Sequence, residues 1–348
     1  MTVRFEGIEG TGNREQGTVG SAPLFPVPSS LFPIAAIGHV VAAVLLLAFP
    51  FVATDFFTFQ IGAYALIMGT IALSLVLLAG YGGMVTLAQM SVAGLAGYMI
   101  AIFGTSAGGT ALGWPWFLAI PAAVIVGTLF NVITGLLAIR TEGIFTIVIT
   151  LAIATAFYYF AQQNYDIFNG HSGFSAVAPA HVLWVDWRAP KPFYFLSLAV
   201  AALSYAGVLY LVRTPFGLAM QAIRDNSRRM EAIGFNVPAH RVAAYAVAGL
   251  IASVAGVLLV WFDGGISPGS ISVDRAIKIL IIAVVGGMRH PAGPFLGAIL
   301  FVLLQNFAID FVNPERFNTY IGLAFLLVVL VSPDGLLGLL SKLGKGSP

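Results

Sequence analysis

The 348-residue sequence contains no cysteine and few charged side chains. Without cysteine the chain cannot form a disulfide framework, a thiolate zinc site, an iron–sulfur cluster or a cysteine nucleophile. Charged residues make up 9% of the chain, compared with about a quarter in soluble proteins. The formal net charge is only +2, so the strong positive field typical of nucleic-acid binding is missing. These deficits exclude most soluble enzymes and argue against a nucleic-acid partner.

Apolar residues, in contrast, make up 59% of the chain, and the mean hydropathy is +0.95. A transmembrane helix needs about 20 apolar residues, and ten runs bounded by glycine, proline or charge approach that length. The sequence therefore predicts an all-α fold, a polytopic transmembrane helical bundle of about 8–10 spans. The ten runs are 33–53, 58–79, 84–103, 115–139, 143–162, 193–212, 242–262, 272–289, 291–311 and 317–335.

Glycine-rich segments leave the exact number of spans open. The run 84–103 and the pair 272–311 fit broken or half-membrane helices as well as full spans. Segments 80–97 and 284–297 each contain Gly-Gly-Met and lie in different halves of the chain. Two five-span halves in inverted orientation would fit this spacing.

Lysine and arginine are unevenly distributed among the loops, and cytoplasmic loops carry the excess in membrane proteins. With a cytoplasmic N-terminus, eleven of these residues fall inside and four outside. We therefore expect a disordered cytoplasmic tail at 1–30, a transmembrane domain at 31–340 and a cytoplasmic tail at 341–348. The loop 163–192 is then external and the loop 213–241 internal. The eleven are Arg4, Arg14, Arg140, Arg213, Arg224, Arg228, Arg229, Arg241, Arg289, Lys342 and Lys345; the four are Arg188, Lys191, Arg275 and Arg316.

The internal loop 213–241 has the pattern of two short amphipathic helices. Thr214-Pro215 offers a capping hydroxyl and a proline at the first helical position. Asp225-Asn226-Ser227 can cap a second helix, and Gly234 supplies a stop. The apolar residues that recur at helical spacing are Ala219, Ala222, Ile223, Met230 and Ile233. The hairpin either lies on anionic lipid or docks into a groove on a cytoplasmic partner.

Motifs for chemistry on a substrate are missing from the sequence. The phosphate-binding pattern Gly-x-x-x-x-Gly-Lys-Ser/Thr does not occur, so any ATP must be hydrolysed by another subunit. The five histidines are scattered and never at metal-ligand spacing. We therefore expect no catalytic residue, no metal and no cofactor. Lys278 is the one clear charge within a span, and we expect it to snorkel toward the outer face near Arg275.

Five blocks of the sequence resemble one transporter family. Arg213-Thr-Pro-Phe-Gly217, Ala222-Ile-Arg-Asp-Asn226 and Glu231-Ala-Ile-Gly234 together resemble the Glu-Ala-Ala…Gly loop of ATP-binding-cassette (ABC) importer permeases. The closer resemblance is to the permease subunits of branched-chain amino-acid importers, the Liv type, M subunit. The other blocks extend the likeness over about residues 60–340; they are Gly80-Tyr-Gly-Gly-Met-Val-Thr-Leu-Ala-Gln89, Arg140-Thr-Glu-Gly143 with Thr150-Leu-Ala152, Gly286-Gly287…Gly293-Pro294…Gly297-Ala298, and Ser332-Pro-Asp-Gly-Leu336.

The resemblance implies a transport subunit rather than an enzyme. It implies a permease that moves branched-chain or related amino acids inward across a bacterial inner (plasma) membrane, with ATP hydrolysed by two ATPase subunits. The other implied partners are a second homologous permease subunit, an extracytoplasmic solute-binding protein, a small polar solute and the lipid bilayer. Permeases for urea or short amides are similar in sequence and stay an alternative. A second alternative is an ion-coupled carrier or channel acting alone, although the ion ligands it needs are scarce within the spans.

Two groups of candidate residues follow. The candidates for ATPase coupling are Arg224, Arg228, Glu231, Ala232 and Gly234. The candidates for the translocation pathway are Gly82, Gly83, Gln89, Thr150, Gly286 and Gly287. Broken helices expose backbone dipoles to a polar solute, and polar side chains within spans can line its path. Close helix crossing and interhelical hydrogen bonds explain the pathway candidates equally well.

Overall fold

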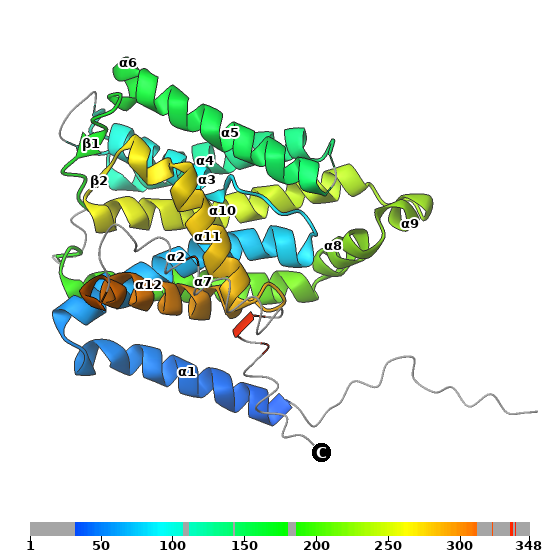
Figure 1. Ribbon diagram of the computed structural model, residues 1–348, viewed down its shortest axis with the longest axis horizontal. Helices are drawn as coiled ribbons and strands as arrows, with labels where there is room; N and C mark the ends of the chain where they lie inside the picture. Colours follow the sequence, from blue (N-terminus) through cyan, green and yellow to red (C-terminus); the bar gives the residue numbers. More distant parts are fainter. Residues whose placement is uncertain are drawn as a thin grey trace, which may run out of the picture. The chain divides into compact units, whose positions relative to one another are not determined.

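The structure is a computed structural model of the chain (Figure 1), and it describes residues 32–106, 111–141, 143–179 and 186–311 with the single positions 322, 335, 336 and 338. The predicted tails, 1–30 and 341–348, lie outside these residues. The chain divides into two compact units, Met1–Leu45 and Leu46–Pro348. The described part of the first unit is the beginning of helix α1 (Phe32–Val52), which ends in the second unit.

The described residues are almost entirely helical, as predicted. Nine of the ten predicted spans coincide with helices, and nearly all of the tenth, 317–335, lies outside the described residues. Five of the described helices are long and apolar enough to cross a membrane. The elements after α1 are η1 (Phe57–Ala63), α2 (Tyr64–Val76), η2 (Leu77–Tyr81), α3 (Gln89–Phe103), α4 (Trp116–Ala138), α5 (Ile144–Gln163), α6 (Tyr165–Phe168), β1 (Phe174–Ser175), α7 (Pro190–Arg213), α8 (Pro215–Asp225), α9 (Ser227–Ala232), α10 (Val237–Asp263), β2 (Gly265–Ile266), η3 (Pro268–Ile271), α11 (Val273–Gly286) and α12 (Gly293–Phe311).

Helices α2 and α10 form the centre of the second unit, with α3, α4, α11 and α12 packed against one or both of them. In the most apolar 18-residue stretch of each helix, the buried share is 89% for the helix that contains α2, 67% for α10 and 17% for α7. A helix that is apolar on all sides is typical of the interior of a helical bundle, and α2 and α10 occupy that position here. Helices α4, α5 and α7 instead expose large apolar side chains such as Ile125, Ile144 and Leu203, which suits contact with lipid or another subunit.

Small residues let the central helices approach closely. A side chain at Gly256 of α10 would overlap the backbone of Ala93 in α3, and one at Gly135 of α4 would overlap Tyr245. Beside that contact, the amide of Asn131 donates a hydrogen bond to the carbonyl oxygen of Tyr245 at 2.6 Å. Small residues combined with buried polar side chains are typical of helix packing in membranes.

The second unit has two distinct ends, which α10 connects. Its 27 residues span about 40 Å at 1.5 Å per residue. At one end β1 pairs antiparallel with β2, with Phe174 opposite Ile266. At the other end lie α8 and α9 (Figure 1). We call these the strand end (β1 and β2) and the hairpin end (α8 and α9).

Two basic side chains of α11 form ion pairs with carboxylates. The ammonium group of Lys278 forms an ion pair with Asp274, one turn earlier, at 2.9 Å. The guanidinium of Arg275 lies 3.5 Å from the carboxylate of Asp263 at the end of α10. Both basic groups therefore have a carboxylate beside them where the chain returns from β2 into the bundle.

Candidate functional site

The hairpin formed by α8 and α9 begins and ends where the sequence indicated. The hydroxyl of Thr214 accepts a hydrogen bond from the first turn of α8 at 3.4 Å, and Pro215 occupies the first helical position. The side chain of Asn226 caps α9 by accepting a backbone hydrogen bond at 3.0 Å. Beyond α9, Gly234 has a φ of +93°, a conformation that favours glycine. Local sequence signals therefore define this hairpin.

One face of the hairpin packs against the bundle. Ala219, Ile223 and Met230 form a small buried cluster with the start of α10. The prediction that Ile233 belongs to this apolar face was wrong, because its side chain is 65% exposed. The helix ends at Ala232, so the next residue leaves the helical register and turns outward.

The other face of the hairpin is exposed and carries four of the five coupling candidates. Ile233 and Phe235 add apolar area to it, being 65% and 40% exposed. Exposed apolar side chains bordered by charge are the usual composition of a protein-binding surface. We call this the α9 surface, and it consists of Arg228, Glu231, Ala232, Ile233, Gly234 and Phe235.

The fifth coupling candidate, Arg224, contacts the bundle instead. Its Nη1 donates a hydrogen bond to the carbonyl oxygen of Gly80 at 2.6 Å. Its Nε and Nη2 each lie 2.9 Å from Oδ1 of Asp225. A Cβ added at Gly83 would lie 2.6 Å from Cγ of Arg224. The arginine therefore ties α8 to the segment where η2 ends.

Two non-helical segments, 82–88 and 287–292, interrupt the bundle close to this contact. The hydroxyl of Tyr81 donates a hydrogen bond to the carbonyl oxygen of Arg289 at 3.2 Å. A Cβ at Gly80 would overlap the carbonyl oxygen of Met288. The two breaks expected from the sequence are therefore present, and the end of η2 that leads into the first break touches the second break. The two inverted five-span halves that would fit the spacing of these breaks stay a prediction.

The four glycine candidates shape these breaks. A Cβ at Gly286 would overlap the carbonyl oxygen of Gly293, where α12 begins, and one at Gly82 would lie 2.7 Å from a carbonyl oxygen of η2. Gly83 and Gly287 have φ values of +69° and +106°, which side chains with a Cβ resist. Each glycine therefore permits either a close backbone approach or a turn.

Gln89 and Thr150 are buried beside the first break. The hydroxyl of Thr150 accepts a hydrogen bond from the amide of Leu87 at 3.2 Å. The carbonyl group of Gln89 accepts from the hydroxyl of Ser74 at 3.0 Å, and its amide donates to Asn131 at 3.5 Å. Gln89 and Thr150 are only 1% and 0% exposed. In this structure both side chains have hydrogen-bond partners within the bundle and are closed to solvent.

Comparison with known protein families matches residues 57–331 to the family described as branched-chain amino acid transport system / permease component. That range contains both breaks and the whole hairpin. The chain belongs to this family. It is therefore a membrane-embedded permease component, as the sequence blocks indicated.

Individual relatives include permeases of more than one kind. The high-affinity branched-chain amino acid transport system permease protein LivM of Escherichia coli is 23% identical over 84% of this chain and 73% of its own length. LivM of Salmonella typhimurium is 23% identical over 77% of this chain, which spans 65% of that relative. The ribose import permease protein RbsC of Haemophilus influenzae is 23% identical over 64% of this chain and 70% of its own length. No solved structure gives a significant match.

The residues that join the two breaks of this permease were not among the predicted site residues. Gly80 and Tyr81 begin the block Gly80–Gln89, which contributes to the family resemblance. The partner of Tyr81 lies 208 residues later in the chain, and no local pattern pairs the two.

In the described residues no group of three or more His, Asp or Glu could hold a metal ion.

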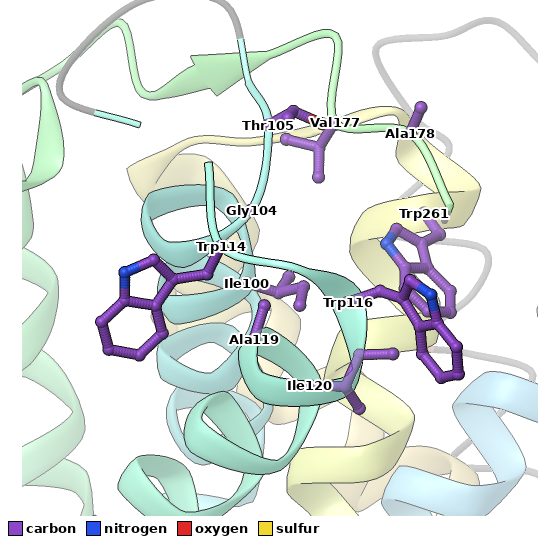
Figure 2. A pocket seen from close by; sticks show the side chains of 10 residues that line it. All are labelled: Ile100, Gly104, Thr105, Trp114, Trp116, Ala119, Ile120, Val177, Ala178 and Trp261. Carbon is purple, nitrogen blue, oxygen red and sulfur yellow. The ribbon is translucent and has the colours of Figure 1, made fainter. Parts of the chain in front are cut away.

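The strand end of the permease contains a cavity of about 180 Å³ (Figure 2). Figure 2 shows Trp116 and Trp261 on one side of the view, Trp114 on the other and Ile100 between them. The ring of Trp114 stacks on Phe103 with centroids 5.0 Å apart. A cavity lined by tryptophan and aliphatic side chains suits an apolar group better than an ion.

Proposed function

We propose that this permease is one of two homologous membrane subunits of an ABC importer, coupled to two ATPase subunits at its hairpin end. The observation that carries the proposal is the chain of contacts from the α9 surface through Arg224 to Gly80. The α9 surface is exposed while the opposite face of the hairpin is packed. This arrangement favours docking into a protein groove over a helix that rests its apolar side on lipid.

The contacts supply a physical route for coupling. Residue Asn226 alone separates α8 from α9, so a displacement of α9 must move α8. Arg224 near the end of α8 would carry that displacement to Gly80 through its 2.6 Å hydrogen bond. Gly80 abuts Met288, so the same movement reaches the second break. Contiguous packed contacts of this kind can couple distant sites.

The hairpin end faces the cytoplasm in this proposal, and both termini are cytoplasmic. The support is charge, because cytoplasmic segments of membrane proteins are rich in arginine and lysine. Five arginines lie on the hairpin, at the end of α7 or at the start of α10; they are Arg213, Arg224, Arg228, Arg229 and Arg241. The strand end then faces an extracytoplasmic solute-binding protein outside the bacterial inner membrane.

The two breaks form the inner gate of the pathway in this proposal. Gln89 and Thr150 are buried beside the first break, so this conformation is closed there. Opening requires the hydrogen bonds that hold Leu87 and Ser74 to be exchanged for contacts with the solute. Gly286 and Gly287 would let the second break move with the first, since the end of η2 touches Met288 and Arg289.

The proposed substrates are branched-chain or related amino acids. The support is the similarity to LivM over 84% of this chain. Sugars are the competing class, because RbsC covers 64% of the chain at the same identity and the xylose transport system permease protein XylH of Escherichia coli is 29% identical over 47% of it. Urea and short amides stay a further alternative.

Reconstitution tests this function. Proteoliposomes that contain the permease, its partner permease and both ATPases should accumulate leucine in the presence of ATP and the solute-binding protein, and should not accumulate ribose. Preferential accumulation of ribose or urea would reject amino acids as the substrate class in favour of sugars or of urea and short amides. Accumulation by this permease alone, driven by an ion gradient, would reject the ABC assembly in favour of a carrier.

A further inference from the structure

A second cavity, of about 190 Å³, lies at the hairpin end between α8, α10, the first break and the turn that joins α4 to α5. One water needs about 10–15 Å³ when volume is measured this way, so the cavity has room for a polyatomic ligand. The residues that matter for its chemistry are Gly83, Gly143, Thr146, Ser227, Arg224 and Arg241.

The described lining of the cavity is positively charged. Arg224 and Arg241 both line it, and none of the described residues that line it is acidic. The charge of Arg224 is shared with Asp225, whose carboxylate is 67% exposed. The Nε of Arg241 is buried and has no hydrogen-bond partner in the part of the chain that the structure describes. A buried charged donor without an acceptor is costly, so this group favours an anionic ligand.

The available donors come from three directions. Ser227, the first residue of α9, has a hydroxyl without a partner among the described residues, and the guanidinium groups of Arg224 and Arg241 lie on α8 and α10. The hydroxyl of Thr146 is not available, because it donates to the carbonyl oxygen of Thr141 at 3.1 Å. A tetrahedral oxyanion presents oxygens in several directions, whereas a carboxylate presents two in one plane. Arginine is the side chain that best matches phosphate oxygens.

We propose that this cavity binds a phosphate group, carried either by an anionic lipid headgroup or by a free phosphate. Bound there, the phosphate joins α8, α10 and the first break, and it holds the hairpin in the position seen in this structure. The site is separate from the α9 surface and does not depend on which solute is transported.

The first test uses the purified full chain in detergent and inorganic phosphate as the probe. Phosphate should raise the melting temperature, relative to chloride at equal ionic strength, in a saturable way. Arg241→Gln should lower the phosphate affinity about tenfold or more, because a charged hydrogen-bond partner is lost. The matched control, Arg213→Gln, removes an exposed arginine at the same end that does not line the cavity and should change the affinity less than twofold.

Two further variants keep the test decisive. If Arg241→Gln does not fold, Ser227→Ala should still weaken phosphate binding several-fold. Glu142 adjoins Gly143 in the sequence and lies outside the described residues; Glu142→Gln should leave the affinity unchanged within about twofold, a change of at most about 0.4 kcal/mol. A tenfold gain in that variant would show that the chain neutralises its own arginines and would overturn the proposal.

Nanodiscs distinguish the two sources. If a lipid headgroup is the ligand, phosphatidylglycerol nanodiscs should abolish the effect of added phosphate on the wild type, while phosphatidylcholine nanodiscs preserve it. If free phosphate is the ligand, its effect persists in both. Either result supports a phosphate site. An equal response of the wild type and Arg241→Gln to phosphate and to phosphatidylglycerol would overturn it.

Discussion

The guanidinium of Arg224 donates a hydrogen bond to the carbonyl oxygen of Gly80, 144 residues earlier in the chain. This contact joins the short helix α8 at the hairpin end to the end of η2. Gly80 in turn abuts Met288, so three segments far apart in the sequence meet at one place. In the proposed mechanism, movement of the hairpin is transmitted to both breaks here.

Arg224→Met should uncouple the importer rather than unfold it. The side chain of Arg224 is 38% exposed, so we expect its loss to cost only about 1 kcal/mol of stability. The assembled complex should continue to hydrolyse ATP, and the solute moved per ATP should fall several-fold. The measurement is ATPase activity and uptake in the same proteoliposomes. Arg213→Met is the control, and equal coupling in both variants would contradict the proposed role of Arg224.

Gly286→Leu should abolish transport, because any Cβ at this position overlaps the carbonyl oxygen of Gly293. The control is Gly207→Leu in α7, where an added Cβ meets nothing within 4 Å and we expect near-normal uptake. Both variants should be compared for membrane insertion as well as for uptake. Normal transport by Gly286→Leu would show that the second break tolerates displacement and plays no part in the gate.

Gln89→Leu should lower both stability and transport. The side chain is 1% exposed, and its removal leaves the amide oxygen of Asn131 without its donor, at a cost of about 1–3 kcal/mol. Gln163→Leu, on the exposed end of α5, should change stability by less than about 0.5 kcal/mol. Thermal unfolding and the concentration dependence of uptake separate the two effects. A destabilised variant with wild-type uptake would remove Gln89 from the pathway.

The cysteine-free background makes the predicted topology testable by labelling. Ser175→Cys at the strand end should react with an impermeant thiol reagent in intact cells, and Ser227→Cys at the hairpin end should react only after permeabilisation. The reason is the concentration of arginine at the hairpin end. The reverse labelling pattern would show the opposite orientation, with the α9 surface outside the cell and away from any ATPase.

Much of the fold could be predicted from the sequence because its signals are local. Apolar runs set the helices, and Thr214, Asn226 and Gly234 set the hairpin through capping and backbone conformation. Contacts between distant segments could not be predicted in this way. The pairings of Tyr81 with Arg289 and of Arg224 with Gly80 depend on tertiary packing, which leaves no periodic pattern in the sequence. Ile233 is a local example. It follows the helical spacing of the apolar residues in the sequence, but α9 ends at Ala232, so its side chain is exposed.

The central claim is that the α9 surface binds an ATPase subunit, and co-purification tests it most directly. Ala232→Asp places a charge in the proposed contact, where an unpaired buried charge costs several kcal/mol, about 3–5 in measured cases, and Gly234→Leu disfavours the +93° backbone turn. Ala239→Asp adds the same charge to an exposed position outside the α9 surface. We predict that the first two variants insert into the membrane but lose the ATPase subunit and uptake together, while Ala239→Asp retains both. Wild-type recovery of the ATPase and wild-type uptake with Ala232→Asp and Gly234→Leu would contradict the account.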